Sequence, residues 1–335
     1  MKILITGGAG FLGSNLAESF LEEGFEVCAL DNLSRNGSDK NLSSLKGVNN
    51  LKFHNADITN KHKVDNIFKS FMPNVTLHFA AQVAMTNSIE NPIHDFNVNA
   101  LGTINILESI RNLNPECSLI YASTNKVYGD LEQFDYSETK KRYVCESFPN
   151  GFDERVALNF HSPYGCSKGS ADQYVLDYSR IYDLKTSVFR HSSMYGQKQN
   201  SSYDQGWIGW FCKQALHQKN NVNSEPFTIS GNGKQVRDIL HVDDIINLYS
   251  KSVKKIDSIS GEAFNIGGGF QNSLSLLELF DFFKERLKVD LKFNKLPFRE
   301  SDQKVFIANL EKINSKLNWL PKKNYQEGLN ELISI

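Results

Sequence analysis

The chain has 335 residues, of which 40% are hydrophobic and 22% charged, and a formal net charge of −1. This is the composition of a globular protein with a sizeable core, and it excludes both a basic field for nucleic acid and an acidic tail, so we expect a small-molecule partner. No stretch resembles a membrane span or a secretory signal, and five widely spaced cysteines without a C-x-x-C motif favour neither disulfides nor a metal site, so we expect a soluble, cytoplasmic protein.

The first 31 residues have the pattern of a dinucleotide-binding unit. The apolar run 3–5 predicts a strand, apolar residues at helical spacing predict a helix over Phe11–Glu23, and Val27–Leu30 predicts a second strand that leads into Asp31. Between the first strand and the helix lie three glycines: Gly7, Gly10 and Gly13. Such a turn brings backbone N–H groups and a helix N-terminus to a pyrophosphate.

Asp31 indicates which dinucleotide the unit binds. It stands about where a carboxylate accepts both ribose hydroxyls of an adenosine. A 2′-phosphate would be repelled there, which favours NAD over NADP. Arg35 lies close enough in the sequence to leave NADP open at this point.

Strands and helices continue to alternate after Asp31. Polar stretches over 32–50 and 130–160 are expected to be a loop and an irregular region. The pattern predicts strands over 51–55, 75–79, 118–123 and 186–190, and helices over about 61–71, 95–113 and 162–182. This alternation predicts a parallel sheet covered on both faces, the doubly wound Rossmann fold of the α/β class. Ligands then bind where the strands end, at Asp57, Ile58, Ala80, Ala81, Gln82, Thr124 and Asn125.

The helix 162–182 carries an apolar stripe, which we interpret as core or as a dimer face. The stripe consists of Ala171, Tyr174, Val175, Tyr178 and Ile181.

After residue 190 the alternation of strands and helices weakens. The remaining pattern predicts a hairpin or strand-turn-strand over 228–240, a helix opening at 241–244, a strand over 264–266, and a helix over 273–287 capped by Ser273 or Ser275. We expect residues 1–190, with a returning segment at about 234–267, to form the dinucleotide domain, and 191–233 with 268–335 to form a smaller mixed α/β substrate lobe.

Two Tyr-x-x-x-Lys matches occur, at Tyr136 and at Tyr164, and their context separates them. Positions i and i+4 share a helix face, so the lysine can lower the pKa of the phenol and contact a nicotinamide ribose. Only the second match, Tyr164 with Lys168, begins a striped helix, so we expect Tyr136 to be a surface residue. A phenol that takes a proton also needs a hydrogen-bonding partner, which Thr124 supplies at the end of a central strand, with Ser123 on the opposite face as the alternative.

Six motifs, in the same order along the chain, resemble the extended short-chain dehydrogenases/reductases of the nucleotide-sugar epimerase/dehydratase group. They are Thr6 to Gly13, Asp31 to Ser34, His78 to Gln82, Ser123 to Gly129, Tyr164-x-x-x-Lys168 and Arg237 to Asp244. The resemblance implies a bound NAD and a homodimer or homotetramer that associates through two helices per subunit, here about 95–113 and 162–182. It also implies a nucleotide-sugar substrate, with a place in the synthesis of lipopolysaccharide O-antigen.

The resemblance assigns roles to individual residues. The implied catalytic residues are Thr124, Tyr164 and Lys168. The implied NAD-binding residues are Gly7, Gly10, Phe11, Leu12, Gly13, Asp31, Asn32, Ser34, Arg35, Asp57, Ile58, Ala80, Ala81, Gln82, Asn99, Tyr164 and Lys168. The implied substrate-binding residues are Thr124, Asn125, His191, Ser193, Arg237, Arg299 and Asp302, with Arg237 and Arg299 at the diphosphate. Spacing alone does not single out Asn99, which fits a solvated polar residue equally well.

Departures from the common patterns narrow the function. Dehydratases of this group place an Asp-Glu pair after the strand-end threonine, where this chain has Asn125 and Lys126, so elimination of water lacks a catalyst. Residues 190–193 replace the common Arg-x-x-Asn with Arg-His-Ser-Ser, so the sugar pocket should differ from that of a 4-epimerase. Strings at 123–133, 160–169, 190–196 and 203–212 resemble the CDP-sugar 2-epimerases, which implies inversion at C2 of a CDP-3,6-dideoxyhexose through a transient 2-keto sugar.

Other functions stay open at this point. A UDP- or GDP-hexose 4- or 2-epimerase would use the same fold, and neither the base nor the sugar can be read from the residues. A non-catalytic NAD-sensing protein is a candidate of another functional class. The presence of all three of Thr124, Tyr164 and Lys168 argues against it. His191, Trp207 and Trp210 are candidate pocket residues that also fit a plain core.

Overall fold

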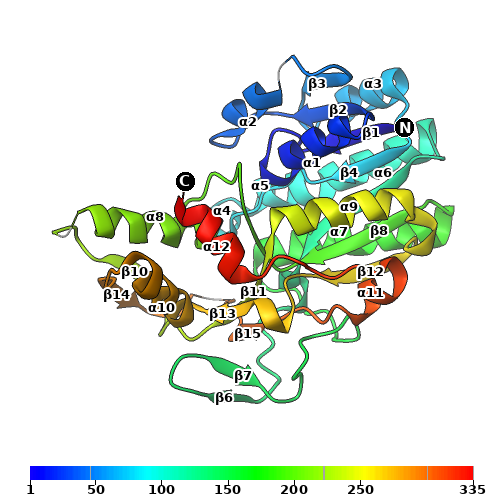
Figure 1. Ribbon diagram of the computed structural model, residues 1–335. Helices are drawn as coiled ribbons and strands as arrows, with labels where there is room; N and C mark the ends of the chain where they lie inside the picture. The colour runs from blue at the N-terminus through cyan, green and yellow to red at the C-terminus, as the bar shows by residue number, and fades with distance from the viewer. Residues whose placement is uncertain (46, 222, 300, 335) are drawn as a thin grey trace.

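A parallel sheet forms the centre of the computed structural model, which describes residues 1–335 except 46, 222, 300 and 335 (Figure 1). In this described part of the chain the sheet has seven strands in the order β12-β8-β5-β4-β1-β2-β3, and all neighbours are parallel. The strands are β1 (Lys2–Thr6), β2 (Glu26–Asp31), β3 (Leu51–Asn55), β4 (Val75–His78), β5 (Ser118–Thr124), β8 (Thr186–His191) and β12 (Glu262–Ile266). The order reverses between β1 and β4, which places the ligand crevice at the carboxyl ends of these strands. The predicted Rossmann fold is confirmed.

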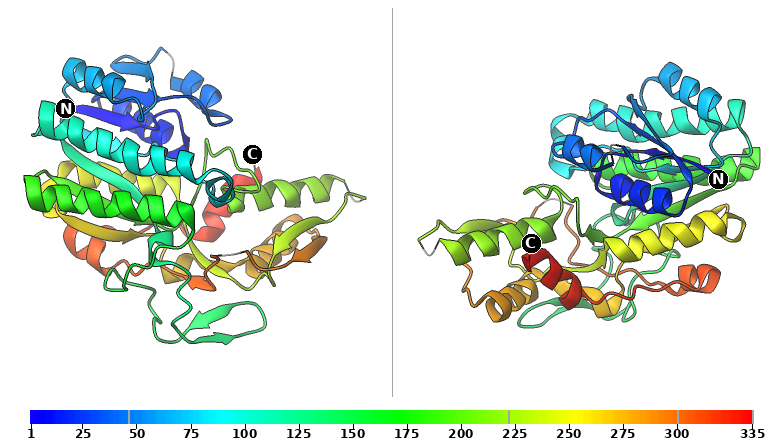
Figure 2. Two further views of the ribbon diagram at one scale, coloured as in Figure 1. Left: turned by 180° about the vertical axis from the view of Figure 1, so that it is seen from behind. Right: turned by 45° about the horizontal axis from the view of Figure 1, so that its top comes forward.

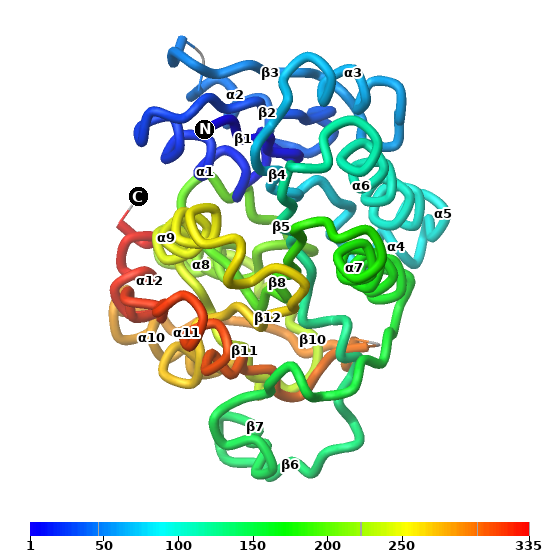
Figure 3. Tube along the Cα trace, turned by 90° about the vertical axis from the view of Figure 1, so that its right-hand side faces the viewer, coloured from blue at the N-terminus to red at the C-terminus, as the bar shows by residue number. Residues whose placement is uncertain are grey.

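Helices cover both faces of the sheet, as the end-on view in Figure 3 shows. On one side lie α1 (Phe11–Glu22) and α9 (Val242–Lys254), and on the other α3 (Lys61–Phe71), α6 (Gly102–Leu113) and α7 (Ser162–Tyr182). Buried apolar side chains such as Phe20 and Leu248 fill the first interface, and Phe68, Ile110 and Val175 fill the second. Helices α3 and α7 and strand β3 begin and end where the sequence predicts.

Two segments in the first half differ from the prediction. The expected loop over 32–50 contains a short helix, α2 (Ser38–Leu45), because Leu42 and Leu45 are buried where it packs against α1. The single helix expected over 95–113 is instead α5 (Pro92–Phe96), a π-helical turn η1 (Asn97–Leu101) and α6, and α4 (Met85–Glu90) precedes them.

The region 130–160, expected to be irregular, contains an antiparallel hairpin of β6 (Tyr136–Glu138) and β7 (Tyr143–Cys145). The hairpin projects from the body of the molecule (Figure 2). Tyr136 is half-buried rather than a surface residue, because its hydroxyl donates to the carbonyl of Leu131 (2.8 Å). It lies on a strand and not on a helix, so its Tyr-x-x-x-Lys pattern does not share one helix face.

The remaining elements build a smaller lobe beside the sheet (Figures 1 and 2). Its strands are β9 (Ser193–Tyr195), β10 (Phe227–Ser230), β11 (Val236–His241), β13 (Ser273–Ser275), β14 (Phe293–Leu296) and β15 (Val305–Phe306). Its helices are α8 (Trp207–Asn220), α10 (Leu276–Leu287) and α12 (Tyr325–Ser334), while α11 (Glu311–Leu317) packs beside β12. Short 3₁₀ turns complete the chain: η2 (Asn125–Tyr128), η3 (Ile256–Ser258) and η4 (Phe270–Asn272).

Strand pairing in the lobe resolves the alternatives that the sequence left open. β10 pairs with β14, whereas β11 pairs with β9, β13 and β15, so residues 228–240 are strand-turn-strand and not a hairpin. Of the two strands in the segment 234–267, which was expected to return to the dinucleotide domain, β11 lies in the small sheet of the lobe and β12 joins the central sheet. The helix expected from residue 273 begins at Leu276, because Ser275 forms a reciprocal capping box with Glu278. Among the described helices, none combines the length and apolar character that crossing a membrane requires.

Two buried histidines should make the fold sensitive to acid. Burial lowers the pKa of both His78 and His191 to about 3. The unfolded chain binds these protons near pH 6.5, so stability is full above that pH and falls as the pH drops toward 3. At pH 5.0 each histidine should cost about 2 kcal/mol.

Urea unfolding midpoints at pH 7.5 and 5.0 measure this effect. The loss of stability between the two pH values should shrink by roughly half in His78→Gln, since one of two similar groups is removed. The exposed His62→Gln serves as the matched control and should keep the wild-type difference. An undiminished difference in His78→Gln would show that His78 does not cause the acid sensitivity.

Candidate active site

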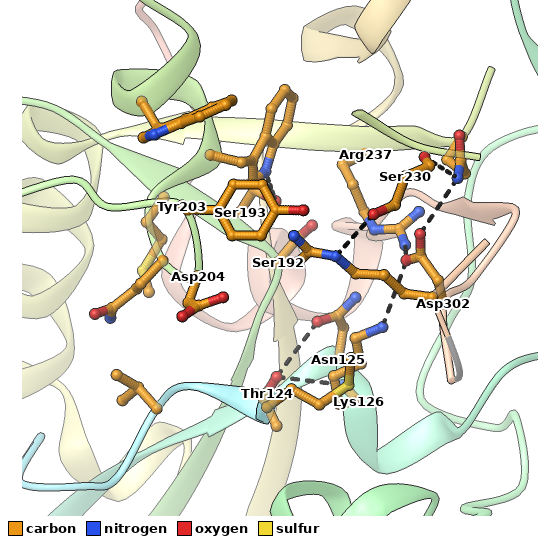
Figure 4. A pocket seen from close by; sticks show the side chains of 18 of the residues that line it. Thr124, Asn125, Lys126, Ser192, Ser193, Tyr203, Asp204, Ser230, Arg237 and Asp302 are labelled. Atoms are coloured by element: carbon orange, nitrogen blue, oxygen red, sulfur yellow. Dashed lines mark hydrogen bonds and ion pairs between the residues drawn. The ribbon is translucent and has the colours of Figure 1, made fainter. Parts of the chain in front are cut away.

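The carboxyl ends of β5 and β8 face a cavity of about 400 Å³ between the sheet and the lobe (Figure 4). Strand register places Thr124 beside His191 at this edge. Every residue expected to bind substrate lines the cavity: Thr124, Asn125, His191, Ser193, Arg237, Arg299 and Asp302. Tyr164, Trp207 and Trp210 line it as well. Residues from six separate segments of the chain therefore converge on one cavity.

Of the three expected catalytic residues, Thr124 and Tyr164 line the cavity, whereas Lys168 is buried against β5 and does not line it. Tyr164 lies in the first turn of α7, and its hydroxyl is close enough to the Thr124 hydroxyl for that group to lower its pKa. Lys168, one turn later and 3% exposed, donates from Nζ to the carbonyl oxygen of Ala122 (2.6 Å) and lies 4.2 Å from the ring centroid of Tyr121. The strand end and the helix thus bring a hydroxyl, a phenol and an ammonium together.

Burial opposes charge on both titrating groups of this set. It raises the pKa of Tyr164 to about 12, and the nearby Thr124 hydroxyl offsets only part of that. It lowers the pKa of Lys168 to about 7, although the carboxylates of Asp172 and Asp95 act in the opposite direction. In the protein alone, the pKa of Tyr164 is therefore raised and not lowered as the Tyr-x-x-x-Lys pattern predicts, and the Lys168 ammonium contacts Ala122 and Tyr121 instead.

A buried ion pair that no sequence motif indicated lies between the two elements that carry Thr124, Tyr164 and Lys168. Arg190 and Asp172, 4% and 0% exposed, form two hydrogen bonds of 2.9 Å. The Asp172 carboxylate also accepts from the hydroxyl of Ser123 (2.7 Å), and Arg190 donates to the hydroxyl of Tyr128 (3.0 Å). The pair joins β5, β8, α7 and η2. Asp172 could have been found from its position one turn after Lys168 on the same helix face.

Asn99 lies inside a second buried network and is not solvated. Its side-chain oxygen Oδ1 accepts from the backbone N–H of Gln82 (2.8 Å). Its side-chain nitrogen Nδ2 lies within hydrogen-bond distance of Asp95 (3.1 Å) and Ser167 (3.0 Å). Gln82 also donates from Nε2 to Asp95 (2.8 Å). The network joins the segment after β4, the π-helical turn and α7 just before Lys168, so Asn99 helps to position this part of the site.

The glycine loop has the shape that a pyrophosphate requires. Gly7 has φ +69°, and a Cβ added at Gly13 would lie 2.1 Å from the carbonyl oxygen of Gly7, so neither position admits a side chain without a backbone shift. Among the described residues, the only atom within 4 Å of a Cβ added at Gly10 is that same oxygen (3.1 Å). Helix α1 begins at Phe11, followed by Leu12, and Gly10 provides no side-chain cap. The open loop and the uncapped helix end fit a dinucleotide pyrophosphate.

The acidic residues after β2 and β3 are held in place by hydrogen bonds. Asp31, 8% exposed, accepts from the backbone N–H groups of Ala9 (3.0 Å) and Leu33 (2.8 Å). Asp57 accepts from Asn32 (2.7 Å) and from Thr59. Burial alone would raise the pKa of Asp57, but these hydrogen bonds outweigh it and lower that pKa. Both carboxylates are therefore fixed at the strand ends where the adenosine was expected.

The other residues expected around the cofactor surround this region. Ser34 donates its backbone N–H to Asn32 (3.1 Å), and the Arg35 guanidinium contacts Gln205 of the lobe. Ile58 is buried against Gly102. Ala80 donates its backbone N–H to the hydroxyl of Thr6 (3.2 Å), and Ala81 follows it at the sheet edge. Arg35 thus reaches the lobe, which the sequence did not indicate.

One wall of the cavity is cationic. Arg237 and Asp302 form an ion pair (2.6 Å), and Arg299 donates to the hydroxyl of Ser230 (3.1 Å) while its guanidinium lies 4.7 Å from the ring centroid of Tyr203. Lys126, which the sequence analysis noted only as a departure from the dehydratase pattern, lies on the same side (Figure 4).

The opposite wall is aromatic and comes from α8. Trp207 donates from Nε1 to the hydroxyl of Ser193 (3.0 Å), and Trp210 packs edge-on against Tyr203 (5.4 Å between centroids). Both tryptophans also pack on the apolar core of the lobe, so they serve as core and as cavity wall. His191 bonds Tyr249 through Nε2 (2.9 Å), while its Nδ1 has no partner among the described residues.

Comparison with known proteins gives one consistent result. The family model described as GDP-mannose 4,6 dehydratase matches residues 4–332. The CDP-paratose 2-epimerase of Salmonella typhi is 54% identical over 332 residues, which cover 99% of this chain and 98% of that protein.

Solved structures show the same similarity. A UDP-glucose 4-epimerase of Thermotoga maritima with UDP-glucose has a TM-score of 0.84 at 29% identity, covering 100% of this chain and 98% of that one. A dTDP-glucose 4,6-dehydratase of Bacillus anthracis in complex with NAD has a TM-score of 0.82 at 28% identity, covering 100% and 96%. The family predicted from the six motifs is confirmed.

Proposed function

The chain belongs to the extended short-chain dehydrogenases/reductases that include the nucleotide-sugar epimerases and dehydratases, and we propose that it is an NAD-dependent 2-epimerase of a CDP-3,6-dideoxyhexose. The observation that carries the proposal is the single cavity with the Thr124–Tyr164 pair at one end and Arg237 and Arg299 on one wall. The 2-epimerase that is 54% identical to the chain supports the choice of base and carbon.

The chain's own residues would act on the C2 hydroxyl. Tyr164, as phenolate, takes the hydroxyl proton and later returns it, while Thr124 donates a hydrogen bond to the reacting oxygen. Lys168 holds positive charge beside the phenol, which favours its ionised form. NAD, when bound, supplies a positively charged ring that lowers the cost of the phenolate and accepts and returns the C2 hydride. The sugar turns over between the two transfers, so C2 is inverted and the cofactor is unchanged.

The glycine loop and Asp31 are the proposed cofactor site. The open face at Gly10 and the uncapped start of α1 would hold the pyrophosphate, and Asp31 would accept the adenosine ribose hydroxyls, which excludes a 2′-phosphate. The lobe, which contains β11 in addition to the predicted residues 191–233 and 268–335, would hold the sugar nucleotide, with Arg237 and Arg299 at its diphosphate. The other NAD and substrate contacts expected from the sequence are proposed with them.

A second copy of the chain is the proposed partner. Part of the stripe on α7 is buried in the core, but Tyr174 and Ile181 are 44% and 51% exposed. Ile93 and Phe96 on α5 and Leu101 on η1 are also exposed, and both elements contact α7 on the same side of the sheet (Figure 3). Pairing of two such surfaces would bury them in a homodimer, and two dimers could form a homotetramer.

Product analysis with a panel of CDP-, GDP- and UDP-sugars tests the proposed function. CDP-paratose and CDP-tyvelose should interconvert, and NMR should assign the inverted centre to C2. Reactions in deuterated water should leave C2 unlabelled, because the hydride returns directly. Inversion of a UDP-hexose at C4 would support the alternative epimerase. NAD binding without any sugar turnover would support the sensing protein, although the complete Thr124–Tyr164–Lys168 set argues against it.

A further inference from the structure

Lys126 is a cation in the cavity to which neither the family's motifs nor the proposed mechanism gives a role. It stands two residues after Thr124, and its backbone N–H donates to the Thr124 hydroxyl (3.3 Å). Its ammonium donates to the carbonyl oxygen of Ser301 (2.8 Å) and lies 3.8 Å from the carboxylate of Asp302 (Figure 4). The side chain is 20% exposed and lines the cavity.

The side chains around Lys126 on this wall of the cavity carry more positive than negative charge. Asp302 already pairs with Arg237 at 2.6 Å, and Arg299 lies close enough to lower the pKa of Lys126. Asp302 is the carboxylate that these three cations share on this wall. Asp130, which pairs with His161, also raises the pKa of Lys126, and Asp204 lies across the cavity (Figure 4). Lys126, Arg237 and Arg299 together carry more positive charge than the Asp302 carboxylate offsets, which suits the anionic diphosphate of a sugar nucleotide. Burial lowers the pKa of Lys126 to about 8, which still leaves the ammonium mostly charged at neutral pH.

The origin of the three cations distinguishes them. Arg237 lies on β11 and Arg299 in the segment between β14 and β15, so both belong to the lobe. Lys126 alone comes from the turn after β5, the strand end that carries Thr124. A phosphate bound by Lys126 would therefore lie nearer to the reacting hydroxyl than one bound by the two arginines alone.

The position of the diphosphate on the sugar ring explains why a phosphate bound by Lys126 would matter for the reaction. The diphosphate is attached to C1, which is bonded to C2 but lies across the ring from C4. When C2 faces Thr124 and Tyr164, the sugar-linked phosphate must be close to these two residues. When C4 faces them instead, the phosphate lies farther away by the width of the sugar ring. We propose that Lys126 binds the sugar-linked phosphate and so selects C2, rather than C4, as the carbon that reacts. This inference rests on the proposed 2-epimerase function and identifies the residue that sets its position of attack.

Lys126→Gln tests the inference, because glutamine can still donate to Ser301 but carries no charge. With CDP-paratose, kcat/KM for inversion at C2 should fall about 10- to 100-fold, as expected for loss of a charge-assisted hydrogen bond to phosphate. NMR should also detect a product inverted at C4, because CDP-paratose has a hydroxyl there. Lys126→Arg retains the charge and should keep C2 as the inverted centre.

Matched controls separate this role from a structural one. Lys251 also donates to a backbone carbonyl, that of Asn318 (2.6 Å), but does not line the cavity, so Lys251→Gln should keep wild-type kinetics. Melting temperature and NAD content verify the fold of each variant, and Lys126→Met replaces Lys126→Gln if the latter does not fold. Unchanged kcat/KM, or lost activity with inversion still confined to C2, would overturn the inference alone. A wild-type protein that inverts no CDP-sugar at C2 would instead overturn the proposed function.

Discussion

Replacing Tyr164 with phenylalanine should lower kcat for C2 inversion by about 10³-fold, the size expected when the group that moves the substrate proton is lost. The ring would still fill its place in the first turn of α7, and only the hydroxyl that lies near Thr124 would be missing. The protein should keep its fold and its NAD content. Initial rates with CDP-paratose, together with cofactor content after denaturation, measure the two effects separately.

Tyr136→Phe is the matched control for this change. Tyr136 begins the other Tyr-x-x-x-Lys sequence, but its hydroxyl donates to the carbonyl of Leu131, and Tyr136 is not among the residues that line the cavity. Its removal should leave kcat within about twofold of wild type, since general acid–base catalysis requires a group that reaches the reacting proton. Near-normal turnover by Tyr164→Phe would show that another group moves the proton.

Replacing Arg190 with methionine should destabilise the fold by about 3–5 kcal/mol, because it leaves a buried carboxylate without its partner. Asp172 is fully buried and shares its charge with Arg190 and the hydroxyl of Ser123. The free energy of unfolding from urea titration at pH 7.5 is the measurement. Catalysis should also weaken in the folded fraction, because the pair joins β5, which carries Thr124, to α7, which carries Tyr164 and Lys168.

Two comparisons make the ion-pair prediction specific. The double variant Arg190→Met with Asp172→Leu should recover much of the lost stability, since replacing both partners removes the uncompensated charge. Arg180 and Asp177 form an exposed pair on the same helix, at 70% and 47% side-chain exposure, so Arg180→Met should cost less than about 1 kcal/mol. Equal losses from Arg190→Met and Arg180→Met would show that the buried pair does not hold the site together.

Local patterns predicted the elements whose stability is itself local. Helix α3 begins after Asn60, whose side chain caps it. Helix α7 extends over the whole predicted span, 162–182. The segment expected as one helix over 95–113 instead contains a π-helical turn, where Asn99 joins the buried network with Gln82 and Asp95. That network depends on partners distant in the sequence, so no periodicity within the helix could predict it.

The apolar stripe of α7 shows the same limit. Spacing assigned Ala171 and Tyr174 to one face, but it could not say how much of that face the neighbouring helices cover. The structure buries Ala171 and leaves Tyr174 and Ile181 exposed. Burial depends on how α4, α5 and α6 pack against α7, which is a property of the assembled fold.

The sequence by itself predicted the groups proposed to bind NAD and to react, which are the glycine loop, Asp31, Thr124, Tyr164 and Lys168, from residue type, spacing within single elements and the order of the six motifs. Only the tertiary structure decided which charges share the cavity. Lys126, Arg237 and Asp302 come from segments more than 60 residues apart. The resemblance already implied Arg237 and Asp302 as substrate-binding residues, but only the fold shows that Lys126 joins them. They meet because the lobe packs against the carboxyl edge of the sheet, and long-range packing of this kind leaves no local pattern in the chain.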